Sequence, residues 1–469
     1  MEFIELNLGD LLLEVKTGKT PLTNNPNYFN GEIDWYTPGD LKGTKYLSDA
    51  DRKITKQAIE ENQSFLYSKG TILVSTIGDI GKVGILEQQA ASNQQITGLL
   101  PNQELIETEL LYYWIIRSKD LFENTANKAV ISMLNNKLLR NIKIKFPLNK
   151  EDQILIISKL NKIQDLIDKR QKTIDLLEQF IISNFLEIFG DPVKIETRRP
   201  LGKLLNNILS GWSPACEDVK RTSVNDNAVL KQGSISKRHY NSLENKLIPE
   251  NLQIKKNIPV EVGDVLFSRK NTQSLVGSTV FIHETEPNLL IPDTIFKLVY
   301  NPKVLNGIYL TYLFNDKNFR KKIQSLANGA NQSMIGISQE SLLTLEIPYP
   351  DIQKQNNFGV FVTIANKFKK DLQLSLKSLD TLFHSTLQNS FRENTQINEI
   401  DIFDNIIESL TIDDFKKGDR KKHLINWLNK DQQRFSDFDK YDDAVKKLFE
   451  LLDNGDLEQV LDNENVILK

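Results

Sequence analysis

The sequence predicts an α+β protein with two tandem mixed α/β modules, each followed by a long helix, and a small all-α extension at the C-terminal end. Three observations lead to this prediction. Two long stretches have apolar residues spaced as in a helix, the segments before them repeat each other, and the last part of the chain differs in charge and pattern. We expect a first module at 1–148, a helix at 149–192, a second module at 198–350, a helix at 351–392 and an extension at 393–469.

The first long helix is expected at residues 151–189, where apolar residues recur every three or four positions with one skipped turn at Arg170. Neither glycine nor proline interrupts the stretch, whereas Gly190 and Pro192 follow it and favour a sharp end. At 1.5 Å per residue such a helix is roughly 60 Å long. A rod of that length with one apolar seam needs a second helix to pack against. Residues 351–391 have the same spacing and also follow a proline, Pro350.

The modules are related by an internal repeat. The pairs Leu8-Gly9 and Leu201-Gly202 stand 193 positions apart, and the phrases KGTILVS and VGDVLFS keep that offset. The long helices align later, at an offset of 202. Short apolar runs bounded by Gly, Pro and Asn predict strands within each module, ending with closing strands in NIKIKFP and TLEIPYP. Helices are expected at 109–122 and 307–326.

The extension has a different composition. Residues 393–469 contain 19 acidic and 11 basic side chains, so the rest of the chain is net basic although the whole has a net charge of −3. Amphipathic spacing predicts short helices at 397–410, 421–428, 441–452 and 457–461. Three roles are compatible with this acidic extension: docking of a partner, covering the recognition faces of the modules in competition with a polyanion, or capping the paired helices.

Catalytic motifs are not evident. A single cysteine, Cys216, and four widely spaced histidines predict neither a disulfide framework nor a metal site. Gly78, Gly81 and Gly84 with Lys82 could form a phosphate cradle, but we favour a turn that needs positive φ between two strands. No methyltransferase motif is found. The first residues lack the pattern of a leader, and no apolar run is long enough for a membrane helix, so we expect a cytoplasmic protein that binds rather than catalyses.

Polar loops in both modules have the residue types that contact DNA. Lys and Arg bind phosphates, whereas Arg, Asn and Gln recognise base edges. The candidates in the first module are Lys19, Asn24, Asn25, Lys42, Lys45, Lys82, Asn93, Gln94, Gln95, Asn127 and Lys128. Those in the second are Gln232, Lys237, Arg238, Arg269, Lys270, Asn271, Gln273, Asn328, Asn331 and Gln332. For any single one of them, a solvated polar loop is the alternative interpretation.

Residues 1–392 resemble the specificity subunits of type I restriction-modification enzymes. The resemblance rests on the L-G-x-L-L starts at Leu8 and Leu201, the G-x-x-L-x-S phrases at Gly70 and Gly263, and the glycine turn IGDIGKVGI before Asn93. Helix starts with a proline and a following glutamine complete the pattern, at Pro147 with Gln153 and at Pro350 with Gln353. The resemblance implies two target-recognition domains, each reading half of a split asymmetric DNA site, held apart by an antiparallel coiled coil.

The same resemblance implies partners that perform the chemistry. Two DNA methyltransferase subunits would dock on this chain and use S-adenosylmethionine, and restriction translocase-nuclease subunits would join with ATP and Mg; this chain would hold no cofactor. The extension departs from the pattern. One alternative is a coiled-coil interaction scaffold without DNA specificity, and another is a nuclease or methyltransferase fragment whose site has no visible motif.

Overall fold

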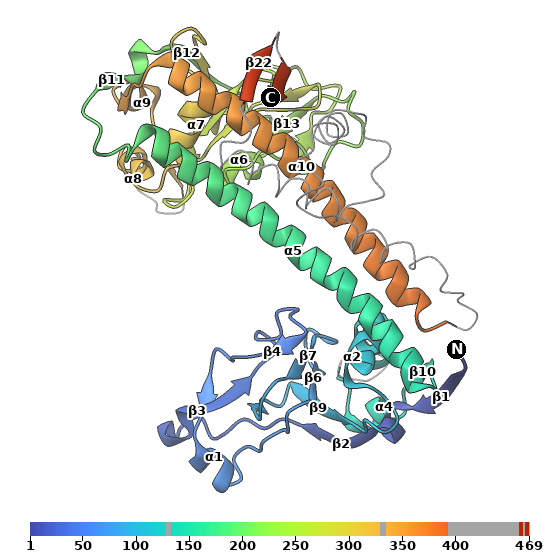
Figure 1. Ribbon diagram of the computed structural model, residues 1–469. Coiled ribbons are helices and arrows are strands. Elements are labelled where there is room, and N and C mark those ends of the chain that lie inside the picture. The colour runs from blue at the N-terminus through green and yellow to red at the C-terminus, as the bar shows by residue number, and fades with distance from the viewer. Residues whose placement is uncertain (128–132, 329–333, 393–458, 463–464, 469) are drawn as a thin grey trace. The chain divides into compact units, whose positions relative to one another are not determined.

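The computed structural model describes residues 1–127, 133–328, 334–392, 459–462 and 465–468 (Figure 1). The chain divides into two compact units. The first comprises residues 1–168 with 377–469, and the second comprises residues 169–376. Each unit therefore contains one predicted module together with a part of both long helices.

The first unit contains a five-stranded sheet, a three-stranded outer sheet and a closing strand pair. The five strands lie in the order β2 (Leu12–Thr17), β9 (Ile96–Pro101), β6 (Ile72–Ser75), β7 (Val83–Leu86) and β4 (Tyr46–Leu47). The outer sheet has the order β5 (Lys53–Ile54), β3 (Phe29–Tyr36) and β8 (Ala91–Ser92). β1 (Phe3–Asn7) pairs antiparallel with β10 (Lys143–Pro147), which brings the two ends of the module together. The short helices are η1 (Leu8–Leu11), η2 (Pro26–Tyr28), α1 (Lys56–Glu60), α2 (Thr108–Arg117), α3 (Lys119–Asn127) and α4 (Asn136–Arg140).

The second unit repeats this plan. Its main sheet has the order β12 (Leu205–Ser210), β19 (Ile295–Tyr300), β15 (Val265–Ser268) and β17 (Thr279–Phe281). Its outer sheet has the order β14 (Asn245–Leu247), β13 (Ala228–Leu230) and β18 (Leu289–Leu290), and β11 (Arg198–Pro200) pairs with β21 (Glu346–Pro348). A further pair joins β16 (Lys270–Asn271) to β20 (Ile335–Gly336). The short helices are η3 (Leu201–Lys203), α6 (Gly233–Ser236), α7 (Gly307–Asn315), α8 (Phe319–Gln324) and α9 (Gln339–Leu343). In both units the central strand of the outer sheet pairs in parallel with the strand that precedes the main-sheet strand β9 or β19.

The two predicted long helices are confirmed as α5 (Lys150–Phe189) and α10 (Ile352–Asn389). In the first unit the beginning of α5 and the end of α10 contribute to one buried cluster, for example through Ile156 and Leu387. In the second unit the end of α5 packs on the beginning of α10, where the rings of Phe180 and Phe361 lie 5.6 Å apart. Beginning meets end in both units, so the two helices run antiparallel within each.

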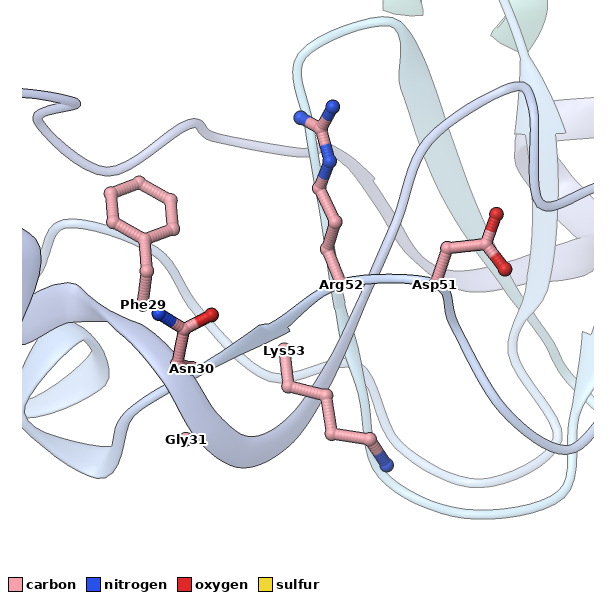
Figure 2. Close-up of a pocket in the computed structure, with 6 residues that line it drawn as sticks. All are labelled: Phe29, Asn30, Gly31, Asp51, Arg52 and Lys53. Carbon is pink, nitrogen blue, oxygen red and sulfur yellow. The ribbon is translucent and has the colours of Figure 1, made fainter.

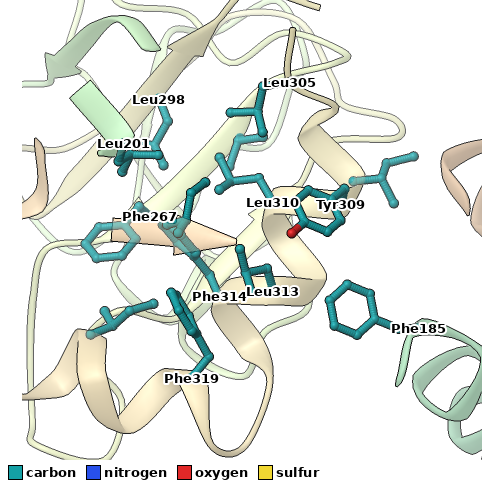
Figure 3. Packing of buried hydrophobic residues seen from close by; sticks show 14 of the residues in the cluster. Phe185, Leu201, Phe267, Leu298, Leu305, Tyr309, Leu310, Leu313, Phe314 and Phe319 are labelled. Atoms are coloured by element: carbon teal, nitrogen blue, oxygen red, sulfur yellow. The ribbon is translucent and has the colours of Figure 1, made fainter. Parts of the chain in front are cut away.

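The core of the second unit shows how a long helix joins a module. Phe185 of α5 points toward Tyr309 of α7 in Figure 3, and the two rings are stacked with centroids 6.0 Å apart. Leu310 and Leu313 of the same helix face the strands of the main sheet, among them β15 with Phe267. Burial of such large apolar side chains is the main favourable contribution to folding. The helix is thus part of the module's core rather than an appendage.

Some predicted elements differ from the structure. The helix expected at 109–122 is divided into α2 and α3 at Ser118, and the helix expected at 307–326 is divided into α7 and α8. The division of the second is explained by Asp316, whose carboxylate accepts from the Phe319 amide and starts a new helix. The helix expected at 457–461 was wrong, because β22 (Gln459–Asp462) pairs there with β23 (Asn465–Leu468). The other helices predicted for the extension lie outside the described residues.

Candidate nucleic-acid interface

Three polar loops of the first unit meet at one end of the main sheet. They are residues 18–25 after β2, residues 76–82 between β6 and β7, and residues 92–95 before β9. The Gly18 amide donates to the Ile96 carbonyl at 2.8 Å, and the Thr76 amide donates to the Gln95 carbonyl at 2.8 Å. We call this surface the first loop end. It carries seven of the predicted residues: Lys19, Asn24, Asn25, Lys82, Asn93, Gln94 and Gln95.

Glycines make the first loop end possible. A Cβ atom on Gly18 would lie 2.1 Å from the Asn93 carbonyl oxygen, so no larger residue fits without moving the loop. Gly78 and Gly81 have φ angles of 82° and 85°, a conformation that favours glycine. The predicted turn between two strands is therefore confirmed.

The amide side chains of the first loop end have different environments. Asn93 is buried, donates to Gln95 Oε1 at 2.9 Å and accepts from the Gln95 amide at 3.0 Å. Gln95 is half-buried, and Gln94 is exposed and accepts a hydrogen bond from the Thr20 hydroxyl. Asn93 thus holds the loop, whereas Gln94 and Gln95 present their side chains at its edge.

The cations of the first loop end are held by neighbouring groups. Lys19 is exposed, and its ammonium donates to the Asn62 carbonyl. Lys82 pairs with Asp79 at 3.0 Å. Asn24 is exposed, while the Asn25 side chain accepts from the Asn27 amide at 3.1 Å and caps the short helix η2. Lys19 and Lys82 are positioned cations at the rim of the sheet end.

Two predicted lysines lie away from the first loop end. Lys42 is exposed and pairs with Asp51 at 3.3 Å beside the outer sheet. Lys45 is half-buried against α2 and α5, where it donates to Glu109 at 2.5 Å and to Asn161 at 2.7 Å. Burial alone would raise the pKa of Glu109, but the hydrogen bonds from Lys45 and Asn161 outweigh it and hold the pKa below its usual range. Lys45 therefore joins the module to its helix.

The second unit has an equivalent surface, the second loop end, at the same end of its main sheet. The Trp212 amide donates to the Ile291 carbonyl at 3.2 Å, and the Gly277 amide donates to the Ser268 carbonyl at 2.8 Å. A Cβ atom on Gly211 would lie 1.8 Å from the Ile291 carbonyl oxygen, which repeats the requirement for glycine seen in the first unit. The predicted residues at this end are Gln232, Arg269, Lys270, Asn271, Gln273 and Asn328.

The amides at the second loop end again divide into buried and exposed ones. Asn271 is buried and donates to the hydroxyls of Ser236 at 3.0 Å and Ser268 at 3.3 Å. Gln232 donates to the Lys270 carbonyl. Gln273 and Asn328 are exposed. Asn271 and Gln232 thus fix the loops, and Gln273 and Asn328 are presented to solvent.

The cations of the second unit include two near the sheet and two beyond it. Arg269 lies over the Phe296 ring at 4.7 Å, and its Nε atom has no hydrogen-bond partner among the described residues. Lys270 pairs with Asp293 at 3.1 Å. Lys237 and Arg238 follow α6 and are exposed, with Arg238 at a φ of 60°.

The remaining candidates are at the limits of the described chain. Lys128, Asn331 and Gln332 lie outside the described residues. Asn127 is the last residue of α3. The segments flanking these positions belong to the loop ends, since the Leu134 amide donates to the Thr76 carbonyl and the Asn328 amide to the Gly336 carbonyl.

The sequence did not single out two arginines that the structure brings forward. Arg320 of α8 is buried beneath the second loop end. Arg52 is exposed at a hollow beside the outer sheet of the first unit, which Figure 2 shows with its lining residues Phe29, Asn30, Gly31, Asp51, Arg52 and Lys53. The RKK run in α8 is typical of a solvated helix face, so the pattern gave no signal that Arg320 is buried.

Among the described residues, no group of three His, Cys, Asp or Glu side chains could hold a metal ion. None of the described helices is long and apolar enough to cross a membrane.

Sequence comparisons relate the chain to known proteins. A family model described as type I restriction modification DNA specificity domain matches residues 2–179. The type I restriction enzyme MjaIX specificity subunit of Methanocaldococcus jannaschii is 30% identical over 243 residues, which cover 50% of this chain and 54% of that protein. The EcoEI specificity subunit of Escherichia coli is 24% identical over 387 residues, covering 78% of this chain and 60% of that protein. The chain thus spans between half and two thirds of the length of these relatives.

Solved structures share the fold. A structure concerning complex assembly and conformational transition of the type I R-M system superposes with a TM-score of 0.51 at 15% identity, covering 84% of this chain and 98% of the other. The type I restriction-modification S subunit from M. genitalium superposes with a TM-score of 0.50 at 14% identity, covering 84% and 97%. At these identities the likeness concerns the fold alone, and it agrees with two modules joined by paired helices.

Proposed function

We propose that the chain is a type I restriction-modification DNA specificity subunit, which recognises a bipartite, asymmetric DNA site without catalysing a reaction itself. The proposal is supported chiefly by one observation. Equivalent polar loop ends occur on both units. Each contains a glycine at which a Cβ atom would clash with the backbone, Gly18 in the first unit and Gly211 in the second. Each loop end combines buried amides that fix the loops with exposed ones that can address base edges.

The two loop ends are equivalent in backbone but not in side chains. The first presents Gln94 and Gln95, whereas the second presents Gln273 with Arg269 and Lys270 nearby. Since side-chain donors and acceptors determine which base is read, two unlike sets favour two unlike half-sites. The target-recognition domains would be residues 1–148 and 198–350, with helices at 149–192 and 351–392.

The proposed partners are those that the resemblance to this family implies. Two methyltransferase subunits would bind S-adenosylmethionine and modify the DNA, and restriction translocase-nuclease subunits would use ATP and Mg. The chain itself would need no cofactor and would act in the cytoplasm. The acidic extension, 393–469, would be a docking element for one of these partners.

A methylation map tests the proposal. Adenine methylation would be mapped across the source genome with the gene intact and with it deleted. Loss of methylation at one split motif on deletion is the expected result. If no motif changes and the purified chain binds duplexes without sequence preference, the coiled-coil scaffold becomes the better description. Methylation or cleavage by the isolated chain would instead favour an enzyme.

A further inference from the structure

Arg320 of α8 is a buried cation without an anionic partner. Its side chain is 5% exposed, and no carboxylate pairs with it in the part of the chain that the structure describes. Its Nη2 atom donates to the Ser274 carbonyl at 3.1 Å, the Val276 carbonyl at 3.0 Å and the Ser278 hydroxyl at 3.1 Å. Its Nη1 atom has no hydrogen-bond partner among the described residues. The hydrogen bonds that this guanidinium donates to described residues therefore all go to one turn, residues 272–278.

Burial of a charge without a counter-charge is unfavourable. Burial, together with the nearby charge of Arg238, lowers the pKa of Arg320 to about 10. A side chain selected for stability alone would be better apolar at such a position, because replacing buried charges by apolar groups is often neutral or stabilising. The arrangement points to a role for Arg320 in the conformation of the turn that it holds.

Gln324, four residues after Arg320 in α8, donates hydrogen bonds to the same turn. Its side-chain amide donates to the Gln273 carbonyl at 2.9 Å and approaches the Ser274 carbonyl at 3.3 Å. Residues four apart lie on one face of a helix. One face of α8 thus clamps residues 273–278 through two side chains.

The clamped turn is connected to the rest of the second loop end. The Ser278 hydroxyl donates to the Ser236 carbonyl at 3.0 Å, and the Ser236 hydroxyl accepts from Asn271 at 3.0 Å. The segment after Ser236 contains the exposed residues Lys237 and Arg238. Moving the turn would therefore displace both Gln273 and the segment that presents these cations.

The corresponding turn of the first unit has hydrogen bonds and an ion pair of its own. The Lys82 amide donates to the Ser75 hydroxyl at 2.9 Å, and Lys82 pairs with Asp79 at 3.0 Å. The two turns share their glycines, since Gly81 and Gly277 both have positive φ. A variant of Arg320 should accordingly act on one loop end only.

We propose that Arg320 is a positioning residue for base recognition by the second module, acting through the turn 272–278 that carries Gln273. The inference rests on the proposed function, since it needs a DNA site to be read. Arg320 would not contact a base; it would fix the backbone from which other side chains do so.

Selection from a duplex library with randomised positions tests this. The full-length chain would be used with its methyltransferase subunits, and the bound duplexes would be sequenced to give base preferences at both half-sites. The variants are Arg320→Met, Arg320→Lys and Gln324→Leu. Lys321→Met is the matched control, because it removes a charge from the exposed face of the same helix. Gln95→Leu is included to identify which half-site the first module reads.

Arg320→Met should flatten base preference at one half-site by about tenfold, the size of one lost base contact. Arg320→Lys should keep part of that preference, and Gln324→Leu should weaken the same half-site. Lys321→Met should change neither preference, and Gln95→Leu should affect the other half-site. Binding to a duplex of unrelated sequence should fall no further for Arg320→Met than for Lys321→Met.

Several results would overturn the positioning role. One is an Arg320→Met protein that keeps both wild-type preferences, and another is equal flattening of both half-sites. If Arg320→Met does not fold, an unchanged preference in the soluble Gln324→Leu protein decides against the role. If the wild-type protein enriches no motif, the proposed function itself is refuted. The two failures can be told apart, because this one is seen with the wild-type protein and does not depend on any variant.

Discussion

Gln153 and Gln355 are equivalent residues of the repeat and make the same hydrogen bonds in their two units. Each side chain is fully buried, whereas Gln353, which the sequence pattern paired with Gln153, is exposed. Gln153 donates to the Pro147 carbonyl at 3.0 Å and accepts from the Glu107 amide at 2.9 Å. Gln355 donates to the Pro350 carbonyl at 2.9 Å and accepts from the Asn306 amide at 3.0 Å. In each unit one amide therefore joins the long helix both to the proline before it and to the start of a module helix.

Replacing either glutamine by leucine should destabilise its own unit. The change leaves a buried amide and a buried carbonyl without their partner, which costs about 1–3 kcal/mol per unsatisfied group. Urea unfolding of the Gln153→Leu and Gln355→Leu proteins measures this loss. Gln171→Leu and Gln353→Leu are matched controls, since both are exposed glutamines on the same two helices. Equal stability of a buried variant and its control would mean that the hydrogen bonds of the buried glutamine do not stabilise its unit.

The Lys45–Glu109 pair should make the stability of the first unit depend on pH in the acid range. The hydrogen bonds from Lys45 and Asn161 hold the pKa of Glu109 below its value in the unfolded chain. Between these two pKa values the unfolded state binds more protons, so stability falls as pH falls. The contribution is fully present above the unfolded pKa of about 4.3 and is lost as pH decreases through the folded one.

Glu109→Gln removes this titration. Its unfolding free energy should vary less with pH below about 5 than that of the wild type, where the unfolded carboxylate begins to bind protons. Thermal or urea unfolding at several pH values measures the difference. Glu104→Gln, an exposed neighbour, should keep the wild-type dependence. Parallel curves for the wild type and Glu109→Gln would show that the pair does not contribute.

The proposed binding of DNA phosphates beside the second loop end predicts a salt effect. Lys237 is exposed beside this surface, and Lys237→Ala should weaken binding of all duplexes alike and reduce the slope of log K against log salt by about one unit. Binding titrations at several salt concentrations would determine the slope. Lys303→Ala is the control, because Lys303 follows β19 at the opposite end of the sheet from the loops. An effect of equal size in both variants would indicate general electrostatics instead.

Several features of the fold could be predicted because they repeat. The apolar spacing of α5 and α10 needs no knowledge of contacts, and the glycines at 18 and 211 recur at one offset. Burial of polar residues could not be predicted in the same way. Asn93, Lys45 and Arg320 look like surface residues in the sequence, yet Asn93 fixes a loop, Lys45 pairs with Glu109, and Arg320 supports a turn. These roles depend on residues distant in sequence, which a local pattern does not contain.

The continuity of the two long helices leads to a prediction about the DNA spacer. Residues 168 and 169 of α5 belong to different units, as do residues 376 and 377 of α10, and both helices continue through these points. Seven residues inserted at both points keep the apolar seam in register and add about 10 Å to each helix. If the helices set the separation of the half-sites, the preferred spacer should lengthen by about three base pairs.

Both half-site sequences should remain unchanged in that variant, because the loop ends are not altered. Motif mapping by methylation or by library selection gives spacer and half-sites together. Exchange of residues 1–148 for the equivalent module of another specificity subunit is the complementary control, and it should change one half-site while the spacer stays the same. An unchanged spacer after the helix insertion would mean that the helices do not determine the spacing. New half-sites would also contradict the prediction, since the insertion leaves every residue of the loop ends in place.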